Sequence, residues 1–223
     1  LMKKLIIFFY LTTISAVSQE IVVDSMKIEN LEEVLVSSVR VKNNMPIAYN
    51  NISKEEISNR NLGQDLPILL NFLPNVVTTS DAGAGIGYTG IRIRGINSQS
   101  TNVTINGIPY NDAESLGTFW VDLPDFSSSV ENLQVQRGIG SSVNGSSAFG
   151  ASINILTDKI SDDPYFENSN SIGSYNTLKN TFRFSTGLIN EQFEFSGRLS
   201  KIDSDGYIDR ASSDLKSYFL QLS

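Results

Sequence analysis

The pattern of apolar and polar positions divides the chain into two parts. From residue 41 to 158, short segments with a helical period stand beside β-prone segments, with turn-forming residues between them. Residues 53–56, Ser-Lys-Glu-Glu, form a capping box and predict a helix that ends near Arg60. A second helix is predicted over residues 64–72, where four leucines share one face: Leu66, Leu69, Leu70 and Leu73.

The rest of this first part has the alternation of β-strands. Strands are predicted over residues 76–79, 91–95, 133–136 and 153–156, and a short helix over residues 123–130. Residues 103–109 predict a hairpin around Asn106-Gly107, the pair favoured in type I′ turns. Together these elements indicate a compact α+β domain of about 120 residues.

From residue 159 onward the sequence predicts alternating strands and little else. In residues 178–185 one side reads Leu, Asn, Phe, Phe and the other reads Lys, Thr, Arg, Ser; a similar pattern resumes over residues 193–200, and a last strand begins near Lys216. About four such strands are typical of a transmembrane β-barrel, although a soluble β-sandwich alternates in the same way. The strands alone leave both architectures open.

The N-terminus has the pattern of a secretion signal. Lys3 and Lys4 precede an apolar run over residues 5–14, and Ala16-Val17-Ser18 is a small-x-small cleavage site. The run is shorter than the roughly 20 residues that span a bilayer, so we expect cleavage after Ser18 and export of the protein.

The amino-acid composition excludes several kinds of partner and catalytic site. The chain has 17 Lys and Arg residues against 24 Asp and Glu residues, an acidic balance that predicts no nucleic-acid partner. It has no cysteine and no histidine, which excludes disulfides, thiolate chemistry, histidine-ligated metals and histidine-dependent triads. We therefore expect no metal site, no cofactor and no enzymatic activity.

Two motifs that would contradict this expectation lack the required context. Residues 85–90 fit the string GxGxxG, but they lead into a strand instead of the helix that a dinucleotide site requires. A secreted hydrolase would need an acid pair such as Asp112 and Glu114 in a cleft, and the surrounding loop gives no sign of one.

Aromatic side chains gather in or beside two long loops of the first part. They are Tyr88, Tyr110, Phe119 and Trp120. Aromatic residues in polar loops suit a ligand-binding platform, and they equally suit packing against a neighbouring wall.

Two arginines on one strand face also have two interpretations. Arg92 and Arg94 alternate with isoleucines. In a soluble domain they would be solvated, whereas inside a barrel they would be buried and would require carboxylate partners.

The order of these segments resembles the TonB-dependent receptor family. Residues 32–37 resemble its TonB box, with Glu33, Val34, Leu35, Val36 and Ser37 as the central residues. Residues 65–76, 91–95, 103–109, 135–138 and 148–155 resemble motifs of its plug domain, and residues 173–177 and 204–207 resemble its first barrel strands. Each motif is weak alone, but their order and spacing are specific.

The resemblance implies an α+β plug domain followed by antiparallel transmembrane β-barrel strands. The implied organisation is a signal peptide (1–18), a flexible leader with the TonB box (19–40), the plug domain (41–158) and the first barrel strands (159–223). Arg137, in an Arg-Gly pair of the plug, joins Arg92 and Arg94 as an expected plug–barrel contact. The implied location is the outer membrane of a Gram-negative bacterium.

The implied function is energised uptake of a scarce ligand. Ligand binds from outside, periplasmic TonB pairs with the box segment, and TonB then pulls on the plug. No additional N-terminal domain of the glycan-importing branch is recognisable, which favours a ferric siderophore or similar metal chelate. About four strands are fewer than the roughly 22 of the family, so a fragment is expected. The alternative is an exported β-rich binding or adhesion module without transport.

Overall fold

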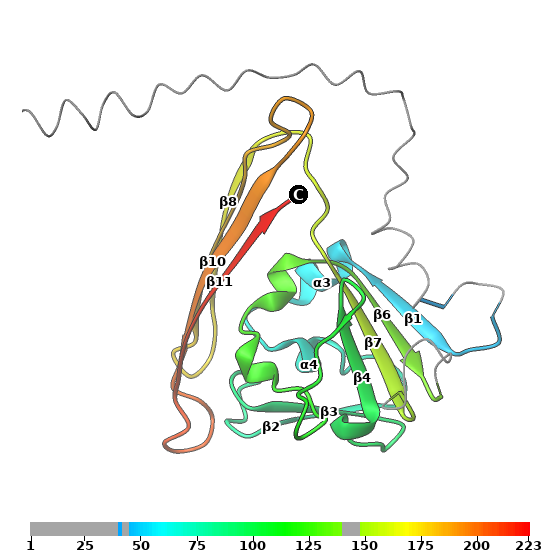
Figure 1. The fold of residues 1–223 in the computed structure, drawn as a ribbon. Helices are drawn as coiled ribbons and strands as arrows, with labels where there is room; N and C mark the ends of the chain where they lie inside the picture. Colours follow the sequence, from blue (N-terminus) through cyan, green and yellow to red (C-terminus); the bar gives the residue numbers. More distant parts are fainter. Residues whose placement is uncertain (1–39, 42–44, 140–147) are drawn as a thin grey trace, which may run out of the picture. The chain divides into compact units, whose positions relative to one another are not determined.

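The computed structural model describes residues 40–41, 45–139 and 148–223. The predicted signal peptide and the predicted TonB box lie outside these ranges. Two groups of elements follow one another along the chain (Figure 1). The first, here called the plug domain, comprises β1 (Tyr49–Ser53), α3 (Lys54–Arg60), α4 (Leu66–Leu69), β2 (Val76–Ser80), β3 (Thr89–Ile93), β4 (Thr101–Ile105), β5 (Ile108–Pro109), β6 (Val130–Arg137) and β7 (Ala151–Thr157), with 3-10 turns η1 (Ser98–Ser100), η2 (Trp120–Asp122) and η3 (Phe126–Ser129).

The second group, here called the wall sheet, consists of four longer strands. They are β8 (Tyr165–Ile172), β9 (Leu178–Ser185), β10 (Phe195–Ser204) and β11 (Ser213–Leu222). Neighbouring strands pair antiparallel in the order β11-β10-β9-β8, so the sheet of the described residues is open at both edges. Within the same ranges, no helix is long and apolar enough to cross a membrane.

The plug domain is built on a five-stranded sheet in the order β1-β6-β7-β4-β5. The β4–β7 pair is parallel and the other pairs are antiparallel. Alternation along β4, β6 and β7 places apolar side chains on one face, where the isoleucines of β7 are fully buried. The α-helices and the β2–β3 ribbon contribute further apolar side chains to this core.

Local sequence signals explain several of these elements. The capping box is confirmed, because the Ser53 hydroxyl accepts from the Glu56 amide and the Glu56 carboxylate accepts from the Ser53 amide. The hairpin is also confirmed, with Asn106 and Gly107 both at positive φ, as a type I′ turn requires. The second helix is shorter than predicted. After Leu69 the backbone continues in turns that bond to the third residue back, although all four leucines are buried as expected.

Alternation in the wall sheet agrees with the sequence pattern. On β9, Lys179, Thr181 and Ser185 are buried toward the plug domain, while Leu178 is exposed on the other face. The outward face carries a set of exposed apolar side chains: Phe166, Leu178, Phe195, Leu199, Tyr218, Leu220 and Leu222. One face of the wall is therefore polar and covered by the plug domain, and the other is largely apolar and open.

Candidate functional site

The central contact between the plug domain and the wall sheet is made by Asp125. This residue follows Pro124 and starts η3 with a φ of 53°, a left-handed conformation that aspartate tolerates better than most residues. Its carboxylate makes no capping bond to η3, and its side chain is completely buried. The local turn thus presents one plug carboxylate to the polar face of the wall.

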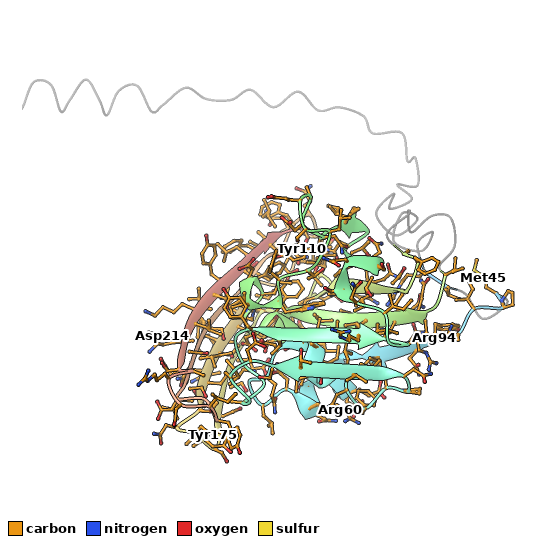
Figure 2. The ribbon with its side chains drawn as sticks, turned by 90° about the horizontal axis from the view of Figure 1, so that it is seen from below. Met45, Arg60, Arg94, Tyr110, Tyr175 and Asp214 are labelled. Carbon is orange, nitrogen blue, oxygen red and sulfur yellow. The ribbon has the colours of Figure 1, made fainter. Side chains whose placement is uncertain are left out.

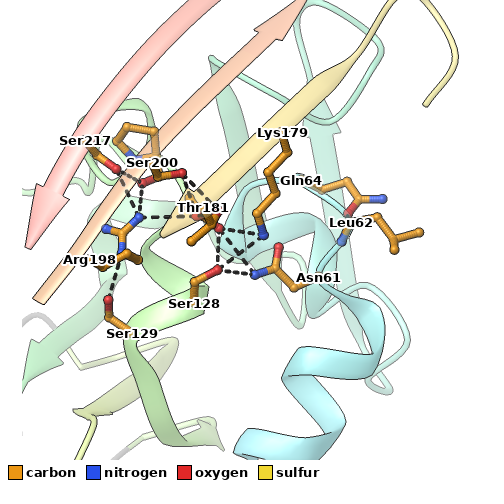
Figure 3. Close-up of polar contacts among 12 residues, drawn as sticks. Asn61, Leu62, Gln64, Ser128, Ser129, Lys179, Thr181, Arg198, Ser200 and Ser217 are labelled. Carbon is orange, nitrogen blue, oxygen red and sulfur yellow. Dashed lines mark hydrogen bonds and ion pairs between the residues drawn. The ribbon is translucent and has the colours of Figure 1, made fainter. Parts of the chain in front are cut away.

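Short hydroxyl side chains and two cations surround this contact (Figure 3). The Oδ1 atom lies 2.8 Å from Lys179 Nζ and accepts from Ser128 Oγ at 2.6 Å. The Oδ2 atom accepts from Thr181 Oγ1 at 2.5 Å and from Ser200 Oγ at 2.6 Å, and it lies 3.4 Å from Arg198 Nη1. The wall therefore supplies two cations and two hydroxyl donors to a single plug carboxylate.

Both wall cations are nearly as deeply buried as their partner. The side chains of Lys179 and Arg198 are 2% and 3% exposed. Arg198 is also tied to the plug domain by Nε, which donates to Ser129 Oγ at 2.8 Å. Since removing one member of such a buried set leaves an uncompensated charge, we expect its loss to cost about 3–5 kcal/mol.

The cations decide the ionisation of Asp125. Burial alone would raise the pKa of this carboxyl group, because a desolvated carboxylate is disfavoured. Lys179 and Arg198 more than offset that effect, and the pKa is lowered to about 2. The contact is therefore an ion pair at every physiological pH.

A second charged contact lies where the chain passes from the plug domain to the wall. The Asp158 carboxylate is 2.6 Å from Lys54 Nζ and 2.6 Å from Arg183 Nη2. Arg183 also pairs with Glu167 at 3.0 Å. In the β9–β10 register Arg183 lies directly opposite Arg198, so each arginine of this facing pair is neutralised by a different plug carboxylate.

The arginines that the sequence predicted as plug–barrel contacts lie away from the Asp125 contact in the described residues. Arg92 and Arg94 are exposed while Ile91 and Ile93 are buried, which agrees with the predicted alternation. Figure 2 shows Arg94 far from Tyr175 and Asp214 of the wall region. Arg137 donates to the carbonyl of Pro74 within the plug domain. Contacts of these arginines with wall carboxylates stay a prediction.

The predicted ligand-binding aromatics divide into two groups. Trp120 is 2% exposed and belongs to the plug core, in agreement with the packing interpretation. Tyr110 is half-buried and packs against that core. Tyr88 and Phe119 are exposed, so these two side chains are available to a ligand.

Sequence reasoning missed Asp125 as the principal plug–wall contact. It placed arginines on the plug and expected carboxylates on the wall, whereas the described contact has the opposite polarity. A signal was present: Lys179 and Arg183 alternate on the polar side of a strand, and buried cations require carboxylate partners. What the pattern could not give was the partner, since Asp125 is 54 residues away from Lys179 in the sequence.

Comparison with known proteins agrees with this geometry. The family model described as the TonB-dependent receptor plug domain matches residues 41–152. The vitamin B12 transporter BtuB of Vibrio vulnificus is 28% identical over 187 residues, which cover 84% of this chain and 28% of that protein. The probable TonB-dependent siderophore receptor PirA of Acinetobacter baumannii is 25% identical over 146 residues, covering 60% of this chain and 19% of that protein.

A solved structure shows the same fold. The alcaligin outer-membrane receptor FauA of Bordetella pertussis superimposes with a TM-score of 0.64 at 13% identity, over 80% of this chain and 29% of that one. The chain belongs to the TonB-dependent receptors, combining their plug domain with antiparallel wall strands. Its relatives are receptors and transporters, not enzymes. The chain spans less than a third of the length of the relatives it matches.

Proposed function

We propose that this chain forms the plug domain and the first wall strands of an outer-membrane receptor for energised, TonB-dependent uptake. The ligand is a ferric siderophore or a similar metal chelate. The receptor lies in the outer membrane of a Gram-negative bacterium, after export through the signal peptide of residues 1–18.

The single observation that carries this proposal is the double-faced wall sheet with Asp125 locked against its polar face. Apolar outward side chains suit hydrocarbon, and a polar inner face suits a lumen. Buried ion pairs hold the plug domain against this polar face, which supports a role for the domain in closing the lumen of a barrel. An adhesion module without transport would have no need of such a closure.

The chemistry of the ligand is supported by the names of the relatives. They include a siderophore receptor and a vitamin B12 transporter, and both ligands are metal chelates. Tyr88 and Phe119 are exposed aromatic side chains that suit contact with such a ligand.

The partner in the periplasm is TonB, and its docking segment is Glu33–Ser37. The run Val34-Leu35-Val36 favours an extended backbone, which suits pairing by strand addition. In that mode main-chain hydrogen bonds provide most of the affinity.

The test is uptake by the natural polypeptide that contains this sequence. A strain that lacks its gene should lose accumulation of one radiolabelled ferric chelate from a panel that also includes cobalamin, and inactivation of TonB should cause the same loss. Direct binding to outer-membrane fractions should remain when TonB is inactivated. Unchanged accumulation of every compound in the panel would reject the proposal.

A further inference from the structure

The plug sheet has an unusual second face. Opposite its apolar core face, the register aligns polar side chains across neighbouring strands: Asn51 of β1 faces Gln134 of β6, and Gln134 faces Asn154 of β7, which in turn faces Thr104 of β4. Gln134, Asn154 and Thr104 are each at most 3% exposed. A buried row of amides and a hydroxyl suits contact with another polar group, such as a main chain.

Gln134 already holds a piece of main chain. Its Oε1 accepts from the Val41 amide at 2.8 Å, and its Nε2 donates to the Val41 carbonyl at 3.1 Å. The other positions of the same amide are also used: Nε2 donates to Asn51 Oδ1 at 2.8 Å, and Oε1 accepts from Gln136 Nε2 at 3.0 Å. All four hydrogen-bonding positions of this side chain are therefore occupied, and its neighbours fix its orientation.

Arg40, the residue before Val41, destabilises the bound state of this segment. Arg40 donates to the Asn132 side chain on the same strand as Gln134, and burial lowers the pKa of this guanidinium group. Within the described residues Arg40 makes no ion pair with a carboxylate. A desolvated cation with an amide partner is costly, so the bound state of this segment is stabilised by Gln134 and opposed by Arg40.

We propose that the polar face of the plug sheet is a docking site for main chain, that its occupant is Arg40–Val41, and that Gln134 is the positioning residue. These two residues connect the predicted TonB-pairing segment to the plug, so the consequence for transport rests on the proposed function. Force applied to the leader reaches β6 first, through the contact of Arg40 with Asn132 and the two bonds of Gln134 to Val41. It reaches the edge strand β1 only after these contacts are broken.

The position of β6 makes this route significant. β6 is flanked by β1 and β7, and its first residue directly follows η3, whose N-cap residue Asp125 contacts the wall. While Val41 is docked, force passes into the strand that is fixed to the wall. Once Val41 is released, the same force peels β1 from the sheet edge, where β6 is the single strand paired with it among the described residues.

The first measurement is hydrogen exchange at the Val41 amide in the natural full-length polypeptide. Gln134→Met keeps the side-chain length but removes both bonds to Val41, and should speed its exchange by at least about tenfold. The Ile155 amide of the central strand β7 should keep its protection. Gln99→Met makes the same change at an exposed position and should alter neither amide.

A second variant protects the test against a folding defect. Asn51→Ala leaves Val41 and Gln134 in place but removes one of the bonds that orient the Gln134 amide, and should give intermediate exchange at Val41. If Val41 exchanges at the wild-type rate in both Gln134→Met and Asn51→Ala, the docking site is disproved.

The third measurement separates this inference from the proposed function. The purified C-terminal domain of TonB should bind the Gln134→Met polypeptide several-fold more tightly than the Gln99→Met control, because less of the leader is docked. Failure of TonB to bind any variant would reject the proposed function, while the exchange data would still decide the docking site. Faster exchange with unchanged TonB affinity would overturn the inferred effect of this docking on TonB pairing.

Discussion

Replacing Asp125 by asparagine tests the plug–wall contact most directly. The new side chain would keep nearly the same shape and could still accept from Thr181 or Ser200. It would leave Lys179 and Arg198, which are 2% and 3% exposed, without their anion. Removing one partner of a buried ion pair costs about 3–5 kcal/mol. We expect a loss of that size in the free energy of unfolding at pH 7.

The assay is urea unfolding of the natural full-length polypeptide in detergent, followed by tryptophan fluorescence. Trp120 lies in the plug core with Phe126, the residue after Asp125, so its emission monitors this region. Asp122→Asn, at an exposed plug carboxylate, is the matched control and should change stability by less than about 1 kcal/mol. Adding Lys179→Met to Asp125→Asn should recover part of the loss, because one stranded cation is removed.

The pH dependence gives the same reasoning a second test. The pKa of Asp125 is lowered from 3.8 to about 2, so its folded state favours the ionised form. The corresponding stability is complete above about pH 4 and is lost as the pH falls toward 2, by about 2 kcal/mol. Asp125→Asn should lack this component. The reasoning is refuted if Asp125→Asn and Asp122→Asn lose equal stability at pH 7.

Three further predictions concern other regions. Burial raises the pKa of Asp65 from 3.8 to about 7, so this group should lower stability by about 3 kcal/mol as the pH rises from 4 to 7. Asp65→Asn should remove that slope from unfolding curves, and an unchanged slope would contradict the prediction. Leu35→Pro should abolish uptake with ligand binding intact, because proline removes a main-chain donor, whereas Leu35→Ala should retain uptake; loss of binding would contradict the role in TonB pairing. Gly206→Ala should destabilise the protein by more than about 2 kcal/mol in urea unfolding, because a Cβ would overlap the Ala211 carbonyl oxygen. Gly95→Ala is the control, because Gly95 has a similar φ and open space around it, and should cost about 1 kcal/mol. Equal losses would show that packing at Gly206 is unimportant.

Elements with short-range signals could be predicted from the sequence. The Ser53 capping box and the Asn106-Gly107 turn each depend on residues within a few positions of one another, and the structure confirms both. The segment predicted as a helix over residues 123–130 is only the 3-10 turn η3, and β6 begins at Val130, earlier than expected. The left-handed conformation of Asp125 explains the difference, because it starts a tight turn instead of an α-helix.

The sequence predicted which side chains lie on the polar face of the wall, but not the ion pairs that they make. Alternation on β9 correctly placed Lys179 and Arg183 on the polar face of the wall. Their partners Asp125 and Asp158 are brought to them by the packing of the plug domain, which no local pattern records. The docking of Val41 on Gln134 joins residues 93 positions apart, and it was missed for the same reason.

The facing arginines of the wall have a consequence for the order of assembly. Arg183 and Arg198 lie opposite each other in the β9–β10 register, and like charges in such a pair disfavour the hairpin. Asp158 neutralises one and Asp125 the other, and both precede the hairpin in the chain. The hairpin is therefore most stable when it forms on an already folded plug domain, which acts as the template for these wall strands.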